Sequence, residues 1–201
     1  MGQLADKVTI ITGAGSGIGR GIARAFAREG AILVLAGRTQ ASLEATAAEL
    51  PQDTTALIVP TDVTDERQVR ALFSQTVEAF GRVDVLVNNA GAFDGGPIEE
   101  ISLETWQHVL AVNLTGPFLC TREAMPIMKA QGGGRIINIG SISAQVPRMN
   151  SVPYTTTKHG LVGLTKAAAL EGRELGVVVS CLHPGNVLTE RRGTRPPTRS
   201  R

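Results

Sequence analysis

Short, almost continuous apolar runs recur along the chain, and segments with a helical spacing of apolar and polar positions separate them. The runs occupy residues 8–11, 31–36, 56–59, 83–87, 135–139 and 177–182. A strand that is buried on both faces of a parallel sheet has this composition. The helical patterns, with apolar positions three and four residues apart, occupy residues 20–28, 42–50, 65–80, 105–112, 117–129 and 154–175.

This alternation of strands and helices predicts a single α/β domain over residues 1–190. We expect a doubly wound, Rossmann-type parallel sheet of about six strands with helices on both faces, connected by right-handed crossovers. The sequence contains no tandem repeat and no change in composition within these residues that would mark a domain boundary.

The first strand runs directly into the sequence Thr-Gly-Ala-Gly-Ser-Gly-Ile-Gly at residues 12–19, and a helical pattern follows. Glycine allows a tight turn and a close approach of the backbone to a ligand, because it lacks Cβ. The following helix directs its free N–H groups and the positive end of its dipole towards an anion. A glycine-rich turn alone is weak evidence, but its position between a strand and a helix indicates phosphate binding.

The end of the second strand carries information about the nucleotide. Dinucleotide folds that prefer NAD usually place an acidic residue there, which binds the ribose 2′-hydroxyl. This chain has Arg38 after Gly37 instead, and a guanidinium can bind a 2′-phosphate through two charge-assisted hydrogen bonds. Arg38 therefore favours NADP. The alternative is an NAD protein in which this arginine faces the solvent.

Tyr154 and Lys158 are spaced four residues apart at the start of the last helical pattern. Residues with this spacing lie on the same face of a helix. A nearby ammonium favours the phenolate form of a tyrosine, which makes Tyr154 a candidate for proton transfer. The alternative is a surface tyrosine that happens to precede a lysine, so this spacing needs support from the rest of the chain.

Length and composition agree with one globular domain. The chain has 201 residues, of which 42% are hydrophobic and 19% charged. No apolar run reaches the roughly 18 residues that a membrane span needs, and the first residues lack the layout of a signal peptide. Cys120 and Cys181 form no Cys-x-x-Cys motif, so we expect a reduced, cytoplasmic protein without a metal site.

The net charge of +2 is located in one segment. Residues 191–201 contain five arginines and no acidic residue, so residues 1–190 are net negative. The domain therefore has no basic stripe of the kind that binds nucleic acid. The arginine- and proline-rich segment 191–201 is expected to be a disordered tail.

Several short motifs occur in the order in which one protein family carries them. They are the glycine-rich loop at residues 12–19, Asn-Asn-Ala-Gly at residues 88–91, Asn113, Ser141, the pair Tyr154 and Lys158, and the dipeptide Pro184-Gly185. In these motifs the chain resembles the short-chain dehydrogenase/reductase family from about residue 5 to residue 190. Each motif is weak alone, whereas their common order over nearly the whole chain is specific.

The resemblance implies an NADP(H)-dependent oxidoreductase that interconverts a carbonyl and a secondary alcohol by hydride transfer. NAD remains the alternative cofactor. Tyr154 would exchange a proton with the substrate oxygen, and Ser141 would hold that oxygen through its hydroxyl. Lys158 would assist Tyr154 and bind the nicotinamide ribose. Asn113 would hold a water that links Lys158 to the solvent.

The same resemblance implies which residues bind the cofactor. Gly13, Ser16, Ile18 and Gly19 would surround the pyrophosphate. The adenosine end would be met by Arg38, Asp62 and Val63, and the floor of the site would be formed by Asn89 and Gly91. The nicotinamide end would contact Pro184, Gly185, Val187 and Thr189, besides Tyr154 and Lys158.

The end of the chain departs from the family pattern. Family members typically continue through a substrate-covering segment, a further strand and a last helix, whereas Thr189 is followed almost at once by the segment 191–201. The resemblance therefore implies a C-terminally shortened form. A second hypothesis is a shortened dinucleotide-binding protein with little or no catalytic activity. The expected partners are a small carbonyl or alcohol substrate and further copies of the chain, in a homodimer or homotetramer, with neither nucleic acid nor a membrane.

Overall fold

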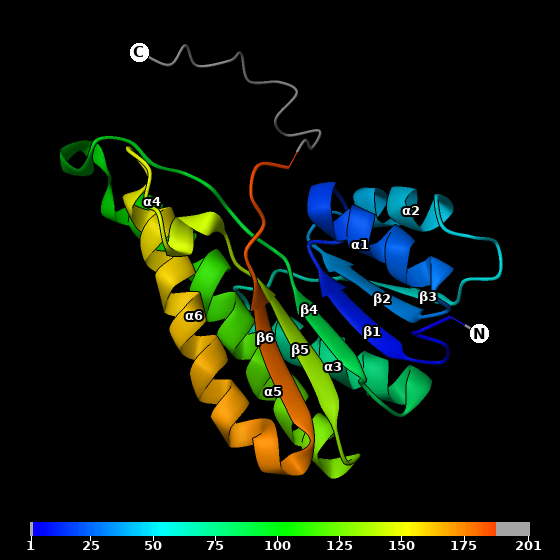
Figure 1. Ribbon diagram of the computed structural model, residues 1–201. Helices are drawn as coiled ribbons and strands as arrows, with labels where there is room; N and C mark the ends of the chain where they lie inside the picture. The colour runs from blue at the N-terminus through cyan, green and yellow to red at the C-terminus, as the bar shows by residue number, and fades with distance from the viewer. Residues whose placement is uncertain (1, 188–201) are drawn as a thin grey trace.

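The computed structural model describes residues 2–187. Six parallel strands form one sheet in the order β3-β2-β1-β4-β5-β6 (Figure 1). The strands are β1 (Val8–Thr12), β2 (Ile32–Gly37), β3 (Ala56–Pro60), β4 (Val85–Asn88), β5 (Gly134–Ile139) and β6 (Val177–Leu182). The predicted six-stranded parallel sheet is confirmed. The predicted tail at residues 191–201 lies outside the described residues.

Helices cover both faces of the sheet, as predicted (Figure 1). They are α1 (Gly17–Arg28), α2 (Gln40–Ala48), α3 (Glu66–Phe80), α4 (Leu103–Leu110), α5 (Gly116–Ala130) and α6 (Val152–Gly172). Adjacent residues of β1 show the division between the faces. Ile11 packs in the core beneath α1 and α2, whereas Ile10 packs in the core beneath α3, α5 and α6. Both side chains are fully buried, which explains the continuous apolar run in this strand.

The strand order reverses between β1 and β4. From β1 the chain proceeds outwards through β2 to β3, returns to β4 on the other side, and then continues to β5 and β6. In open α/β sheets the connections on either side of such a reversal separate at the carboxyl ends of the strands and leave a crevice for a ligand. The fold therefore predicts that the site lies after β1 and β4.

The two helical patterns at residues 105–112 and 117–129 belong to one continuous helical run. Between α4 and α5 lies a π-helical turn, Ala111–Thr115, which contains Asn113. Such a turn inserts an extra residue into the helix and is frequent at functional sites. Two 3-10 turns that the apolar pattern does not predict lie at Ile98–Glu100 and Ile142–Ala144, and the end of the pattern predicted at residues 154–175 forms a third, Arg173–Leu175.

A buried carboxylate holds the amino-terminal edge of the sheet. Asp84 accepts a hydrogen bond from the backbone N–H of Val8 (2.9 Å) and forms an ion pair with Arg82 (2.6 Å). Burial alone would raise the pKa of Asp84, but the hydrogen bonds from Arg82 and Val8 outweigh it and hold the pKa below its ordinary value. Because Asp84 lies within the apolar run at residues 83–87, the sequence pattern does not reveal that its carboxylate joins β1 to the segment before β4.

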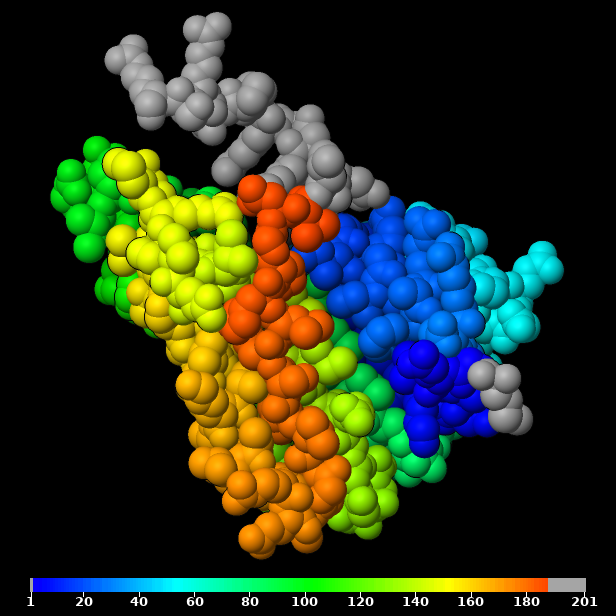
Figure 2. All heavy atoms as spheres, in the orientation of Figure 1, coloured from blue at the N-terminus to red at the C-terminus, as the bar shows by residue number. Residues whose placement is uncertain are grey.

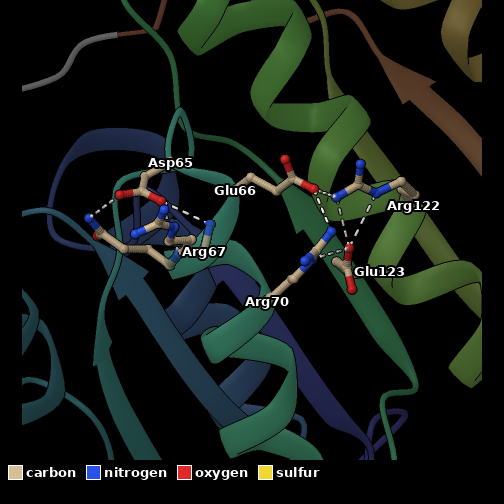
Figure 3. A network of polar contacts seen from close by, with 7 residues as sticks. Asp65, Glu66, Arg67, Arg70, Arg122 and Glu123 are labelled. Carbon is tan, nitrogen blue, oxygen red and sulfur yellow. Dashed lines mark hydrogen bonds and ion pairs between the residues drawn. The ribbon is translucent and has the colours of Figure 1, made fainter.

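The start of α3 is fastened in two ways (Figure 3). Asp65 caps the helix by accepting hydrogen bonds from the backbone N–H groups of Arg67 and Gln68. The neighbouring Glu66 accepts a hydrogen bond from Arg122 of α5 (2.8 Å). Glu66 also pairs with Arg70, and both arginines contact Glu123, so the four side chains form a ring of alternating charges. The hydrogen bond from Arg122 lowers the pKa of Glu66. Helices α3 and α5 are thus joined across the surface of one face.

Within residues 2–187, the helices fall short of the combined length and apolar character that crossing a bilayer requires.

Candidate active site

The ends of β1 and β4 are joined by hydrogen bonds at the point where the strand order reverses. The Thr12 hydroxyl oxygen accepts from the backbone N–H groups of Asn89 and Ala90, both at 3.0 Å. The Asn89 side chain donates through Nδ2 to the carbonyl oxygens of Thr12 (2.8 Å) and Gly13 (3.2 Å). Asn89, predicted to form the floor of a cofactor site, therefore also fixes the backbone of the glycine-rich loop.

Two glycines of this loop are required by close packing. Gly13 has φ +65°, and a Cβ there would lie 2.9 Å from the Cα of Ala90. A Cβ on Gly19 would lie 2.3 Å from the carbonyl oxygen of Gly13 and 2.5 Å from Nδ2 of Asn89. Side chains at these positions would force apart the loop, the first turn of α1 and the segment after β4. Both positions therefore need glycine.

The first turn of α1 fits an anionic group. It contains no acidic residue, and the N-cap residue Ser16 makes no capping hydrogen bond through its side chain. Ser16 is exposed, and Ile18 is half-buried in the same turn. The first N–H groups of a helix lack partners within the helix, and the dipole makes this end positive. The residues present therefore suit the pyrophosphate of a dinucleotide.

A second set of contacts supports the loop from outside. Arg20 donates through Nη2 to the carbonyl oxygen of Gly15 (2.8 Å) and through Nε to the hydroxyl of Thr46 on α2 (3.2 Å). Thr46 in turn donates to the carbonyl oxygen of Ala14 (3.0 Å). The sequence analysis did not identify Arg20 or Thr46, because their roles depend on how α2 packs against the loop.

The residues predicted for the adenosine end lie after β2 and β3. Arg38 is exposed and follows Gly37, where a built Cβ would lie 3.9 Å from the Cα of Gly13 in the glycine-rich loop. Asp62 accepts at Oδ1 from the backbone and hydroxyl of Thr64. The side chain of Val63 is buried in the core, so any contact with an adenine would come from its backbone.

Lys158 is the buried cation of the site. Its side chain extends from α6 to the end of β5, where Nζ donates to the carbonyl oxygen of Ile139 (2.7 Å). The ammonium lies 5.4 Å from the centre of the Tyr154 ring, so the predicted pair does share one face of α6. Burial lowers the pKa of Lys158 to about 8, and an electrostatic interaction with Cys181 acts in the opposite direction.

Asn113 joins the segment after β4 to α6. Its Oδ1 accepts from the backbone N–H of Ala92 (2.7 Å), and its Nδ2 donates to the carbonyl oxygen of the same residue (2.8 Å). The second proton of Nδ2 points to the hydroxyl of Thr157 (3.3 Å). Thr157 precedes Lys158 and donates to the carbonyl oxygen of Tyr154 (2.7 Å). Because both side-chain donors of Asn113 are used, a water at this residue would be held by its oxygen atoms.

Ser141 lies two residues beyond the carbonyl that holds Lys158. Its hydroxyl oxygen accepts a hydrogen bond from the backbone N–H of Ser143 (3.1 Å) and caps the 3-10 turn Ile142–Ala144. A serine hydroxyl has one proton to donate and two lone pairs. The contact with Ser143 uses a lone pair, so the Ser141 proton remains available to a substrate oxygen.

Two residues near the candidate catalytic residues were not identified by the sequence analysis. The ring of Phe93 packs edge-on against the ring of Tyr154, with 5.1 Å between their centres. His183 contacts the carbonyl oxygen of Ser141 through Nδ1 (2.9 Å). Both residues follow the carboxyl end of a strand, β4 or β6, and this position is the signal by which they could have been found.

The residues predicted for the nicotinamide end follow β6. Figure 2 shows the segment after β6, in red, between the region of the loop after β5 and the amino-terminal part of the chain. The carbonyl oxygen of Pro184 accepts from the backbone N–H of Ile142 (3.3 Å). Gly185 and Val187 are exposed, as is Gly91 on the side of β4. The predicted cofactor residue Thr189 lies outside the described residues.

Comparisons with known proteins agree with this geometry. A family model described as short chain dehydrogenase matches residues 7–200. An uncharacterized oxidoreductase of Bacillus subtilis (strain 168) is 42% identical over 185 residues, which are 92% of this chain and 72% of that protein. L-fucose dehydrogenase of Oryctolagus cuniculus is 41% identical over 188 residues, covering 93% of this chain and 65% of that protein.

Among solved structures, this chain is similar to 3-ketoacyl-(acyl-carrier-protein) reductase from Brucella melitensis, whose crystal structure is a complex with NADH. The TM-score is 0.91 at 36% sequence identity, and the match covers 96% of this chain and 80% of that chain. The agreement therefore extends over nearly all of the residues that build the sheet, the glycine-rich loop and α6.

The glycine-rich loop gives a prediction with a matched control on the same helix. Gly19→Ala should destabilise the protein by roughly 1–3 kcal/mol, because the new methyl group overlaps the loop backbone. Gly21→Ala should be neutral or stabilising by up to about 1 kcal/mol, because a Cβ there meets nothing within 4 Å and alanine favours the helix. Urea denaturation measures both. Equal stability of the two variants would contradict the packing described for Gly19.

Proposed function

Since the chain belongs to the short-chain dehydrogenase family, we propose that it is an NADP(H)-dependent oxidoreductase that interconverts a carbonyl and a secondary alcohol. The observation that carries this proposal is the placement of Lys158. Its buried ammonium lies beside the Tyr154 ring and is held by the carbonyl oxygen of Ile139, two residues before Ser141. One contact thus brings the candidate proton donor, its cation and the substrate-binding hydroxyl to the same strand end.

Tyr154 acts as the general acid and base in this proposal. In the direction of reduction its hydroxyl protonates the substrate oxygen, and in the direction of oxidation its phenolate accepts the alcohol proton. Lys158 stabilises the phenolate through its positive charge. A bound nicotinamide dinucleotide would supply or accept the hydride. The ring of Phe93 packs against Tyr154 and restricts its orientation.

Ser141 and Asn113 support this proton transfer. Ser141 donates its free proton to the substrate oxygen and stabilises the charge that develops there. Asn113 fixes the start of α6 against the segment after β4 through Thr157 and Ala92. A water held by the oxygen atoms of Asn113 would connect Lys158 to the solvent.

The cofactor would lie across the crevice after β1 and β4. Gly13, Ser16, Ile18 and Gly19 surround the pyrophosphate in this proposal, and Asp62 and Val63 meet the adenine. The floor is formed by Asn89 and Gly91. The nicotinamide end meets the residues after β6, namely Pro184, Gly185, Val187 and Thr189. Support comes from the close-packed loop and from the uncapped first turn of α1.

Arg38 supports NADP over NAD. It is exposed at the end of β2, beside the glycine-rich loop, and forms no hydrogen bond or ion pair within the described part of the chain. A 2′-phosphate would provide the anion that this guanidinium lacks. NAD remains the alternative cofactor, and the similar ketoacyl reductase was solved with NADH.

Similar proteins are named for different substrates. The name of one states a sugar, L-fucose, and that of another a 3-ketoacyl group on a carrier protein. A second candidate function is binding of a dinucleotide with little catalysis. Tight NADPH binding without turnover across a panel of ketones and alcohols would support this second function and contradict the first.

We also propose that copies of the chain pair through α5 and α6. These helices lie side by side on one face of the sheet (Figure 1), and a groove of about 350 Å³ runs between them. Phe118, Met125, Leu164 and Ala167 contribute apolar surface to this groove, and Phe118 is 47% exposed. A second copy would bury this apolar strip, which Arg122 and Glu171 also line.

Replacing Tyr154 with phenylalanine tests the proton-transfer role. Tyr154→Phe removes only the hydroxyl and keeps the ring contact with Phe93, so NADPH binding should persist. Turnover of ketones with NADPH should fall about 10²–10⁴-fold, the usual contribution of a general acid. Steady-state kinetics and a fluorescence titration of NADPH measure the two properties. A variant as active as the wild type would rule out this mechanism.

Replacing Arg38 with aspartate tests the cofactor choice. Arg38→Asp should weaken NADPH binding about ten- to a hundredfold, because a charge-assisted contact worth about 1.5–3 kcal/mol is lost, and should not weaken NADH binding. Arg173→Asp is the control, since Arg173 is exposed at the opposite edge of the sheet. Calorimetric titration measures the dissociation constants of NADPH and NADH for each of the two variants. An unchanged preference in Arg38→Asp would show that Arg38 does not select the cofactor.

A charge placed in the α5–α6 groove tests the pairing. Ala167→Arg should convert a dimer or tetramer into a smaller species, because it introduces a bulky cation into the proposed apolar contact. Ala79→Arg, on the exposed side of α3, should leave the assembly unchanged. Sedimentation velocity measures the mass. A monomeric wild type, or an Ala167→Arg variant with the wild-type mass, would contradict pairing through this face.

A further inference from the structure

The loop after β5 and the segment after β6 remain joined beyond the ends of their strands. The backbone N–H of Gly140 donates to the carbonyl oxygen of Leu182 (2.7 Å), and that of Ile142 donates to Pro184 (3.3 Å). Between these two lies a contact made by a side chain, from Nδ1 of His183 to the carbonyl oxygen of Ser141 (2.9 Å). The imidazole thus bridges the same two segments as the flanking backbone hydrogen bonds.

The partner of His183 fixes the tautomer of its ring. A carbonyl oxygen only accepts hydrogen bonds, so Nδ1 must carry the proton in this contact. The ring also lies close to the backbone of Gly140, since a Cβ built there would lie 2.8 Å from Nδ1 of His183. The glycine at position 140 leaves the room that the imidazole occupies. Two independent features, a hydrogen bond and a close approach, therefore place the ring beside Ser141.

We propose that His183 is a positioning residue that sets the Ser141 hydroxyl relative to the segment after β6. The inference rests on the proposed function, in which Ser141 holds the substrate oxygen and residues 184–187 contact the nicotinamide end of the cofactor. The carbonyl group that His183 holds belongs to Ser141 itself. Fixing this peptide plane fixes the direction of the Cα–Cβ bond, and therefore the place from which the hydroxyl donates.

His183 lies between the two proposed halves of the site, the substrate-binding side and the nicotinamide-binding side. On one side it holds Ser141, whose hydroxyl oxygen is already fixed by the N–H of Ser143. On the other side it begins the segment that contains Pro184 and Gly185. Reacting groups must be held to within about 1 Å, and a displacement of that size can reduce the rate about a hundredfold. His183 keeps the substrate-binding side and the nicotinamide-binding side of the site at a constant spacing.

Two substitutions separate positioning from simple packing. His183→Leu replaces the imidazole with an apolar side chain of moderate size and removes the N–H donor. His183→Asn restores an N–H donor at nearly the same distance from the backbone as Nδ1. We expect kcat/KM for a ketone with NADPH to fall about ten- to a hundredfold in His183→Leu and to return to within about threefold of the wild type in His183→Asn. His108→Leu, an exposed position on α4, is the control and should retain wild-type kinetics.

A second measurement needs neither cofactor nor turnover. In the ligand-free protein, ¹⁵N NMR of the histidine side chains reports which ring nitrogen carries the proton, and the His183 signals are those lost in His183→Leu. Under conditions where the imidazole is neutral, we expect the proton on Nδ1. A proton on Nε2 would overturn the proposal, because the hydrogen bond to Ser141 could not exist.

The outcomes also separate this inference from the proposed function. An inactive wild type that binds NADPH contradicts the oxidoreductase function itself. An active wild type matched by His183→Leu contradicts the role of His183 alone. So does a His183→Asn variant that is as impaired as His183→Leu, because a restored donor must then have no effect. Melting temperatures of all variants show whether a loss of kcat/KM reflects unfolding. His183→Asn should recover activity although its melting temperature is close to that of His183→Leu, so that a difference in stability does not explain the recovery.

Discussion

The architecture of the site depends on burying the ammonium of Lys158 beside the sheet. Removing a charged group from water is costly unless it is hydrogen-bonded, and here the carbonyl oxygen of Ile139 provides the partner (2.7 Å). Burial still lowers the pKa of Lys158 to about 8. The end of β5 thereby fixes the position of α6 along the sheet. Tyr154, one helical turn earlier, is positioned by the same contact.

A row of buried polar side chains seats the helices over the sheet. Asn88 on β4 and Asn138 on β5 are register partners. Asn88 donates to Asn138 (2.8 Å), and Asn138 donates to Thr165 of α6 (2.8 Å). The hydrogen bond from Asn138 to Thr165 forms only when the helix lies in one register, whereas apolar packing tolerates small shifts. The row therefore complements Lys158 in giving α6 a single position.

The sequence was sufficient for the order of the elements and for the face of α6 that carries Tyr154 and Lys158. Both follow from local periodicity, which a chain reveals without knowledge of its packing. The partners of the polar side chains could not be obtained in this way. Asn113 binds Ala92, 21 residues away in the sequence, and Asp84 lies buried within a run that reads as apolar. Such contacts depend on the packing of elements that are distant in the chain, so only the structure reveals them.

Several motif residues use their side-chain hydrogen bonds within the protein, which limits what remains for a ligand. Asn89 uses both described Nδ2 contacts on the loop that contains Gly13, and Asn113 uses both of its donors on the protein. In the proposed function, the hydroxyls of Tyr154 and Ser141 bind the reacting oxygen of the substrate. In such a framework the surrounding loops would contact the rest of the substrate. This agrees with the different substrates named for proteins about 40% identical to this chain. In this proposal, contacts that hold those loops to the framework, such as that of His183, set how precisely a substrate is presented to Tyr154.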